Sequence, residues 1–369
     1  MEKKTTYCYN DITIVPAAIS HISSRKECNP FYQDGMLPLF AAPMDSVVCL
    51  ENYDTYIKNS ITPILPRNID FGTRIGYAVS GKWAAFSLGE FVEHFTKREN
   101  KLDNLPNKIR ALIDVANGHM KAIYDAVSDS KRIYGSNIEV MVGNIANPET
   151  YRHVFESGAD YVRCSIGSGS CCITSSNTAV HYGTATLIEE IRELKERLSQ
   201  ENGVPMEKMP KIIADGGIRN YSDVNKALAL GADYVMVGGL FATFVESGGS
   251  LFYGNGAEVS YLPSDIIVSD GVCRLKHDLG DINLGVLYKR IYGMASRKGQ
   301  ASISGCSMKT AEGIEREIVI KYNMRSWVEN MKDYLKSAMS YTDSKTLEDF
   351  IGKAETVIVS NNTYHSVNK

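Results

Sequence analysis

The sequence predicts an α/β protein folded as a single (β/α)8 barrel, also called a TIM barrel. Three observations lead to this prediction. Short apolar runs recur along the first two thirds of the chain, helix-like stretches separate most of them, and small, polar or ionisable residues follow them directly. Strands alternating with helices are typical of α/β folds, and a barrel carries its active site at the carboxyl ends of its strands. We therefore expect residues 1–369 to form one catalytic domain.

The apolar runs are the predicted barrel strands. They are almost continuously apolar, which is typical of parallel strands buried on both faces. In chain order they are Leu37–Ala42, Ile61–Leu65, Trp83–Leu88, Ile109–Val115, Ile138–Val142, Asp160–Cys164, Lys211–Ala214 and Tyr234–Val237. The helix-like stretches between them include Phe91–Arg98, Met120–Arg132, Pro148–Ser157, Thr184–Gln200 and Ser222–Leu230. A doubly wound sheet could accommodate the same alternation.

The C-terminal third departs from this alternation. Residues 247–290 and 296–312 are rich in glycine and polar residues and are longer than most loops of a compact domain. We expect them to be long loops, with residues 296–312 acting as a mobile flap. Helix-like stretches at 326–339 and 345–353, followed by the apolar Val357–Val359, could supply the last barrel helix.

Composition limits the function classes. The net charge of -3 argues against general affinity for nucleic acid, and no apolar run approaches the roughly 20 residues that a membrane span needs. The polar N-terminus lacks the apolar region of a signal peptide, and the 8 cysteines include no CxxC pair. We expect a cytoplasmic protein with no disulfide framework, no zinc site and no nucleic-acid or membrane partner.

The most informative segment follows the sixth predicted strand and reads Gly-Ser-Gly-Ser-Cys-Cys-Ile-Thr at residues 167–174. A glycine–serine loop at a strand end exposes backbone N–H groups to an anion. Cys172 is a candidate nucleophile and Thr174 a candidate proton carrier. Chemistry alone does not separate Cys172 from its neighbour Cys171, and a small buried cysteine is the structural alternative.

Two glycine pairs end the last two predicted strands, where TIM barrels commonly bind phosphate. They are Gly216 and Gly217, which follow Asp215, and Gly238 and Gly239. Asp215 could accept hydrogen bonds from two ribose hydroxyls, whereas tight turns that need glycine would explain either pair alone. Together with Ser170, the two pairs predict a site for a nucleoside monophosphate or another sugar phosphate.

Two further segments carry ionisable candidates. Asp114, Asn117 and Gly118 follow the fourth predicted strand and could contact a second ligand or support the nucleophile, although Asp114 could instead cap the next helix. Glu312 follows the predicted flap. It could act as an acid or base if the flap folds over the site, and is otherwise a surface carboxylate.

In this order, the motifs resemble the IMP dehydrogenase/GMP reductase family over nearly the whole chain. The combination of the Gly167–Thr174 loop with Ala214–Gly217 is highly specific. The resemblance implies that Cys172 is the nucleophile and that Thr174 and Glu312 transfer a proton. It implies substrate contacts from Ser170, Asp215, Gly216, Gly217, Gly238, Gly239, Tyr292, Gly293, Met294, Ser296 and Lys309. It also implies cofactor contacts from Asp114, Asn117 and Gly118, and a monovalent cation such as K+ at Gly167, Gly169 and Cys172.

Within the family, the sequence is more similar to the reductases. It lacks the inserted CBS modules usual in dehydrogenases, and its short flap has no Arg-Tyr pair to activate water. Asp114–Gly118 and Tyr292–Ser296 also resemble the reductase versions, although Pro66 and Arg67 replace a His-Lys pair of the family. The resemblance implies a homotetramer that deaminates GMP reductively to IMP with NADPH. NAD-dependent oxidation of IMP to XMP is the alternative within the family, and a non-catalytic purine-nucleotide sensor or a flavin-dependent barrel enzyme are alternatives from other classes.

Overall fold

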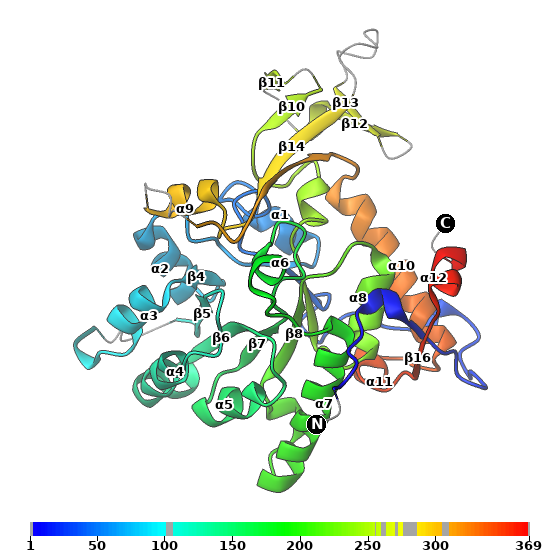
Figure 1. Cartoon of the computed structure of the whole chain (residues 1–369), viewed down its shortest axis with the longest axis horizontal. Helices are drawn as coiled ribbons and strands as arrows, with labels where there is room; N and C mark the ends of the chain where they lie inside the picture. Colours follow the sequence, from blue (N-terminus) through cyan, green and yellow to red (C-terminus); the bar gives the residue numbers. More distant parts are fainter. Residues whose placement is uncertain are drawn as a thin grey trace.

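The protein is a barrel of parallel strands wrapped by helices, with a smaller antiparallel sheet attached to one end (Figure 1). The computed structural model describes residues 3–100, 106–254, 256–259, 263–269, 272–275, 286–304 and 310–367. None of the helices in this part of the chain combines the length and hydrophobicity that a membrane-spanning helix needs.

In the described residues, the barrel strands adjoin in the order β3-β2-β9-β8-β7-β6-β5-β4. Leu65, which follows β3, closes the ring: its N–H donates to the Trp83 carbonyl at 3.0 Å, and its carbonyl accepts from the Ala85 N–H at 2.9 Å. The strands are β2 (Leu39–Ala41), β3 (Thr62–Pro63), β4 (Ala84–Phe86), β5 (Ile109–Asp114), β6 (Ile138–Ile145), β7 (Tyr161–Cys164), β8 (Lys211–Asp215) and β9 (Tyr234–Val237). The predicted (β/α)8 barrel is confirmed.

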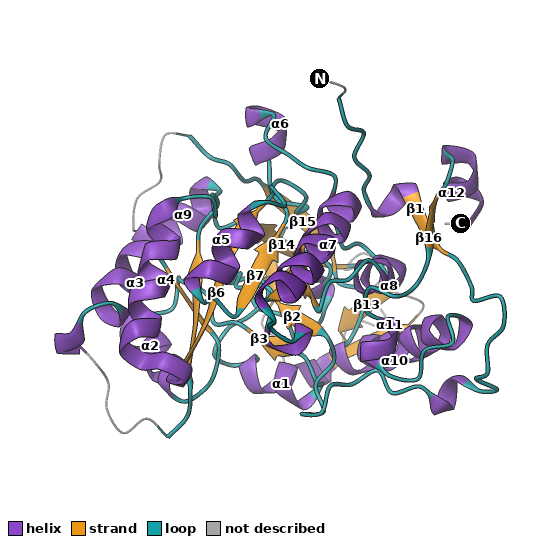
Figure 2. Ribbon diagram, turned by 90° about the horizontal axis from the view of Figure 1, so that it is seen from below, coloured by secondary structure: helices purple, strands orange, loops and turns teal. Residues whose placement is uncertain are grey.

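Amphipathic helices form the outer layer and bury their apolar faces against the strands (Figure 2). Residues that cap the N-terminus favour the formation of several of these helices. At the beginning of α3, the Ser87 hydroxyl accepts from the Glu90 N–H at 3.2 Å and the Glu90 carboxylate accepts from the Ser87 N–H at 2.7 Å. The helices around the barrel are α1 (Tyr53–Lys58), α2 (Phe71–Val79), α3 (Leu88–Phe95), α4 (Lys121–Tyr134), α5 (Thr150–Ser157), α7 (Thr184–Asn202), α8 (Tyr221–Ala229) and α10 (Met324–Tyr341).

The core has two layers. The barrel interior is filled by large side chains that include Phe40, Trp83 and Met141, whereas a larger cluster lies between the strands and the helices. Burying apolar side chains of this size stabilises the fold by about 25 cal/mol for each Å² removed from water. The filled interior means that the barrel is no pore, so a ligand has to bind at one of its ends.

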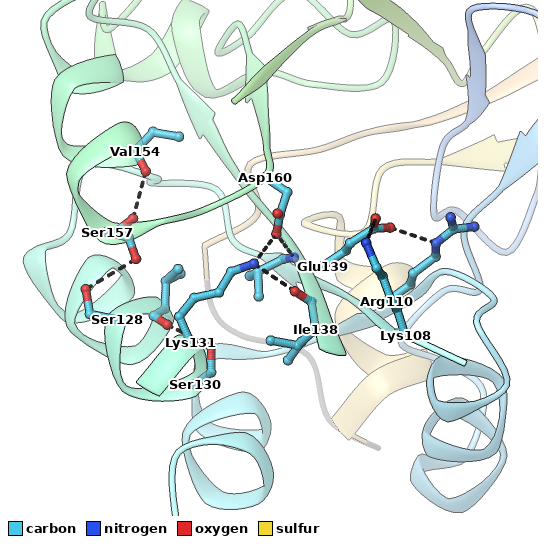
Figure 3. A network of polar contacts seen from close by, with 12 residues as sticks. Lys108, Arg110, Ser128, Ser130, Lys131, Ile138, Glu139, Val154, Ser157 and Asp160 are labelled. Carbon is cyan, nitrogen blue, oxygen red and sulfur yellow. Dashed lines mark hydrogen bonds and ion pairs between the residues drawn. The ribbon is translucent and has the colours of Figure 1, made fainter. Parts of the chain in front are cut away.

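Ion pairs join elements at the amino ends of the central strands (Figure 3). Lys131 donates to the Asp160 carboxylate at 2.6 Å, and the same carboxylate accepts from the Val140 N–H at 2.7 Å. Arg110 of β5 pairs with Glu139 of β6 at 2.9 Å. The amino-terminal face of a TIM barrel contributes to stability, and the opposite face is left for function.

The expectation of long loops in residues 247–290 is wrong for the part that the structure describes. Strands β10 (Leu251–Tyr253), β11 (Glu258–Val259), β14 (Leu287–Tyr292) and β15 (Glu315–Val319) form an antiparallel sheet in the order β11-β10-β14-β15, and β12 (Ile266–Ser269) pairs with β13 (Val272–Leu275). This sheet has its own apolar cluster around Leu251, Leu275 and Leu287. Within the predicted flap, Arg297–Ser304 form helix α9, and residues 305–309 lie outside the described part.

A strand near each end of the chain joins a small sheet on one side of the barrel (Figure 2). Strand β1 (Ile12–Ile14) pairs antiparallel with β16 (Thr356–Ile358), which covers the expected apolar segment near residue 357. Three short helices complete the described structure: α6 (Thr174–Thr178), α11 (Leu347–Phe350) and α12 (Asn361–Val367).

Candidate active site

A cavity of about 850 Å³ opens between the carboxyl ends of the barrel strands and the four-stranded sheet. The barrel lines it with the loops after β2, β5, β7, β8 and β9, and the sheet lines it with residues of β14, β15 and their connections. Ligand sites of TIM barrels lie at this face. The predicted strand-end motifs therefore meet in one place, and the sheet closes the cavity from the other side.

A chain of three side chains crosses from the barrel to the sheet. The Cys172 thiol donates to the Thr174 hydroxyl at 3.3 Å, and that hydroxyl donates to the Glu312 carboxylate at 2.8 Å. Backbone bonds hold the two segments together, because Ile173 N–H donates to the Glu312 carbonyl at 3.0 Å. This geometry connects a thiol to a carboxylate through one hydroxyl, which is the arrangement needed to move a proton to or from a reacting group.

The structure separates the two adjacent cysteines. Cys171 is only 4% exposed, and burial raises the pKa of its thiol, with Ser170 and Arg316 lowering it in part. Its carbonyl accepts from the Ile314 N–H at 2.9 Å, which fixes its backbone to the connection that leads into β15. Cys172 is partly exposed in the cavity and is hydrogen-bonded to Thr174. A thiol nucleophile must be accessible, so Cys172 is the better candidate.

The two glycine pairs and Ser170 come together in the cavity as predicted. Gly216 and Gly217 have φ angles of 106° and 77°, which side chains rarely adopt. The Ser170 hydroxyl lies against Gly239, so the loops after β7 and β9 are in contact. The result is a concave backbone surface at two strand ends, of the kind that binds phosphate.

Arg163, which the sequence analysis did not single out, lies under this surface. It is a buried cation on β7 that pairs with Asp114 of β5 at 2.6 Å and with Asp215 of β8 at 2.8 Å. Burial opposes its charge, but the two carboxylates more than compensate and raise the pKa of Arg163. Asn144 also donates to Asp215 Oδ2 at 2.8 Å, so Asp215 keeps only its other oxygen for a ligand. The signal in the sequence that could have identified Arg163 is a charged residue within a mostly apolar strand.

Several predicted contacts lie away from the cavity wall. The Tyr292 hydroxyl bonds Asp45 and lines a second cavity of about 290 Å³. The Ser296 hydroxyl accepts from the Gly299 N–H at 3.1 Å at the start of α9. Asn117 accepts from the His119 N–H at 3.1 Å, and the Gly118 N–H donates to the Asn144 carbonyl at 2.8 Å. Each of these groups makes an internal hydrogen bond, and its contact with a ligand stays a prediction.

The remaining predicted positions divide between the cavity and the loop beside it. Gly293 and Met294 line the main cavity, and Lys309 lies outside the described residues. At the predicted cation site, the Gly167 carbonyl accepts from the Ser175 hydroxyl at 3.2 Å and the Gly169 carbonyl from the Cys172 N–H at 3.0 Å. In the described part of the chain, no group of three or more His, Cys, Asp or Glu side chains could hold a metal ion.

Comparison with known proteins agrees with this geometry. The family model described as IMP dehydrogenase / GMP reductase domain matches residues 88–367. A GMP reductase of Shouchella clausii is 27% identical over 372 residues, which cover 98% of both chains. The GMP reductase of Bacillus subtilis is 27% identical over 98% of both chains, and that of Caenorhabditis elegans is 26% identical over 89% of this chain and 82% of its own. The chain therefore belongs to the IMP dehydrogenase/GMP reductase family of oxidoreductases.

Proposed function

We propose that the protein is a GMP reductase, which converts GMP to IMP and ammonia with NADPH as the reductant. The hydrogen-bonded chain from Cys172 through Thr174 to Glu312 carries this proposal. It places a nucleophile and a proton carrier together in a cavity that also holds a phosphate-binding surface. The GMP reductases to which the chain is similar along its whole length support the choice of substrate.

The proposed reaction has two steps, the loss of ammonia and the addition of a hydride. Cys172 Sγ bonds to C2 of GMP, and the thiol proton passes through Thr174 to Glu312. The same path returns the proton to the 2-amino group, the bond from C2 to nitrogen breaks, and ammonia leaves a thioimidate on Cys172. After a hydride has been added to C2, the bond from C2 to sulfur breaks and releases IMP. General acid–base help of this kind contributes about 10²–10⁴-fold, and covalent catalysis splits one difficult displacement into two easier steps.

The residues beside Asp114 fit a nicotinamide ring. Its carboxamide has one acceptor and two donor hydrogens. Within the described residues, Arg67 Nε and Asn68 Oδ1 are a buried donor and a buried acceptor without partners. Arg67 Nη1 donates at 3.3 Å to the carbonyl of Asp114, a residue that lines the cavity. We infer that Arg67, Asn68 and Asp114 would hold the nicotinamide of NADPH, which when bound supplies the hydride.

Three further parts of the proposal rest on the family resemblance. We infer a homotetramer, a cytoplasmic location and a K+ ion at the carbonyls of Gly167, Gly169 and Cys172. The Gly167 and Gly169 carbonyls each accept one internal hydrogen bond, and a carbonyl oxygen has a second lone pair available for a cation. Activity compared in K+ and in Na+ buffers checks the cation, and sedimentation checks the assembly.

One assay tests the reaction. Absorbance at 340 nm is followed with GMP plus NADPH, and separately with IMP plus NAD, with and without K+. We expect a loss of absorbance in the first mixture and no change in the second. A gain in the second mixture alone would identify an IMP dehydrogenase, no change in either would favour a nucleotide sensor, and a yellow preparation would favour a flavin enzyme.

A further inference from the structure

The second cavity, of about 290 Å³, lies beside the main one across strand β14. Successive side chains of a strand point to opposite faces, so Ile291 lines the main cavity and Tyr292 lines the second. The loop after β2 is divided in the same way, with Met44 at the main cavity and Asp45 and Ser46 at the second. The second cavity thus shares two walls with the candidate active site but is lined by different residues.

Two residues of this cavity hold buried polar atoms without a partner. Within the described part of the chain, Asp45 Oδ1 and Ser46 Oγ form no hydrogen bond, although Ser46 is only 2% exposed. The other carboxylate oxygen of Asp45 accepts from the Tyr292 hydroxyl. A buried polar group that lacks a hydrogen bond costs about 1–3 kcal/mol. A ligand that donates hydrogen bonds to this carboxylate and this hydroxyl would remove that cost.

A lysine supplies the opposite charge at the same cavity. The Lys298 ammonium lies 4.8 Å from the centre of the Tyr292 ring, whose hydroxyl bonds Asp45. Burial raises the pKa of the Asp45 carboxyl, and the Tyr292 hydroxyl and the charge of Lys298 lower it in part. Among the described residues, neither Asp45 nor Lys298 has an ion-pair partner, whereas Arg290 of this cavity pairs with Glu317 at 3.2 Å. One negative and one positive charge therefore lie near each other without being paired.

This pair of charges selects a ligand that carries both signs. A metal ion would add a positive charge beside Lys298, and a simple anion would add a negative charge beside Asp45. A zwitterion satisfies both residues: its ammonium has three hydrogens to donate to Asp45 Oδ1 and Ser46 Oγ, and its carboxylate accepts from Lys298. The cavity is at the lower end of the size range of small-molecule sites, which suits one amino acid better than a nucleotide.

The segment between the two cavities is bonded to the proton path of the proposed reaction. It runs from Tyr292 at the second cavity to Ala295 at the main one, directly before helix α9, which carries Lys298. The Ala295 carbonyl accepts from the Glu312 N–H at 3.0 Å. A ligand held between the barrel and Lys298 therefore restrains the segment on which the position of Glu312 depends.

We propose that the second cavity binds a free α-amino acid, whose ammonium contacts Asp45 and Ser46 and whose carboxylate contacts Lys298. The bound amino acid changes the affinity of the main cavity for its nucleotide through the segment that ends at Ala295. Binding of the amino acid does not depend on the proposed function, and only the identity of the nucleotide rests on it.

The first experiment measures binding to the unmodified protein. Thermal unfolding is recorded with each of the common L-amino acids, since a ligand that binds only the folded state raises Tm. Isothermal titration then compares the amino acid that gives the largest rise with its methyl ester, which lacks the carboxylate charge, and with its N-acetyl derivative, which lacks the ammonium. We expect each derivative to bind about 10-fold more weakly, because each loses a charge-assisted contact.

Variants assign each contact to its residue. Lys298→Met should weaken binding of the amino acid by about 10-fold and abolish its preference over the methyl ester. Asp45→Asn keeps an acceptor for the Tyr292 hydroxyl and should abolish the preference over the N-acetyl derivative. Arg297→Met is the matched control, because Arg297 is the exposed neighbour of Lys298 on α9 and lines neither cavity, so its loss should leave the affinity unchanged.

The results that would overturn the inference are specific. They are a panel in which no amino acid raises Tm, equal affinities for the amino acid and both derivatives, or full affinity in both Lys298→Met and Asp45→Asn. Titration of GMP with and without saturating amino acid tests the link between the cavities, and we expect a change of about 5-fold or more. An unchanged GMP affinity would refute that link. If the amino acid binds with these dependences but GMP is not reduced, the proposed function fails and the amino-acid site stands.

Discussion

The barrel mouth and the four-stranded sheet line the same cavity but present different electrostatic surfaces to it. At the barrel mouth, Arg163 forms ion pairs with two carboxylates at 2.6 and 2.8 Å. Loops that contain glycine present their backbone to the cavity. The sheet contributes Arg316, which has no ion-pair partner in the described structure. The segment that enters β15 contributes Glu312. The charged group of the barrel mouth is thus held by internal ion pairs, whereas the arginine of the sheet is exposed to solvent.

A single lysine joins the two regions. Lys289 of β14 is fully buried, and its ammonium donates to the carbonyls of Phe244, Val245 and Ser247 at 3.2, 3.3 and 2.6 Å. These carbonyls belong to the segment that follows the last barrel strand. Lys289 therefore anchors the sheet to the barrel, together with the bond from Tyr292 to Asp45 and the backbone bonds around Cys172 and Gly313. If this comparison holds, changes in each region should have separable effects.

The largest effect is expected at the barrel mouth. Cys172→Ala should lower kcat by roughly 10⁴-fold or more, because the loss of a covalent nucleophile removes the whole two-step route. Cys171→Ala should keep kcat within about 10-fold, since that thiol is buried and serves packing. Single-turnover measurements with GMP and NADPH check both. The reverse pattern would assign the nucleophile to Cys171.

Arg163→Met tests whether the barrel mouth depends on its buried charges. Removing this cation leaves Asp114 and Asp215 unpaired, and we expect a loss of about 3–5 kcal/mol in the free energy of unfolding. Arg110→Met removes an arginine whose side chain is 41% exposed, and its pair should contribute at most about 1 kcal/mol. Urea unfolding of both variants gives the comparison. Equal losses would contradict a special role for Arg163.

Glu312→Gln tests the contribution of the sheet side to the chemistry. The amide cannot take up a proton from Thr174, so kcat should fall by about 10²-fold while the Kd for GMP changes little. Glu315→Gln, an exposed carboxylate three residues further on, should have no effect. Stopped-flow traces for both variants separate binding from chemistry. An unchanged kcat in Glu312→Gln would remove this residue from the proposed proton path.

The smallest effect concerns the lysine that joins the regions. Burial lowers the pKa of Lys289 from 10.5 to about 7, so between these values the unfolded chain binds one more proton than the folded protein. The free energy of unfolding should therefore rise with pH across this window, by about 1 kcal/mol from pH 7.5 to 8.5. Lys289→Met should lack this rise. Unfolding curves at the two pH values measure it, and identical slopes in both proteins would contradict the assignment.

The barrel was predictable because its evidence is local. Mostly apolar runs such as Ile138–Val142 and capped helices such as the one beginning at Leu88 form in nearly the predicted places. The sheet was missed because the buried positions of β14 are Leu287, Lys289 and Ile291, and the charged Lys289 breaks the apolar alternation that would mark a strand. Such alternation indicates a strand only when a partner is known, and β15 follows 23 residues after the end of β14.

The residues of the candidate site also divide into those that the local sequence predicts and those that it does not. Cys172, Thr174, Asp215 and the glycine pairs were found because they follow predicted strands, and the cavity brings them together. Tyr292 and Ile291 line different cavities, because successive side chains on a strand point to opposite faces. Arg163 and Arg316 went unnoticed because an isolated arginine has no sequence pattern of its own.

The sequence by itself determined the barrel, the loop that carries the nucleophile and the family, since each depends on residues close together in the chain. Only the tertiary structure shows that Cys171 is buried and Cys172 partly exposed, because exposure depends on what packs over the loop. Only it brought Glu312 to Thr174 across 138 residues and placed Arg316 at the wall of the cavity. The physical reason is that strand register and burial are set by distant partners, whereas strand formation and loop chemistry are set by neighbours.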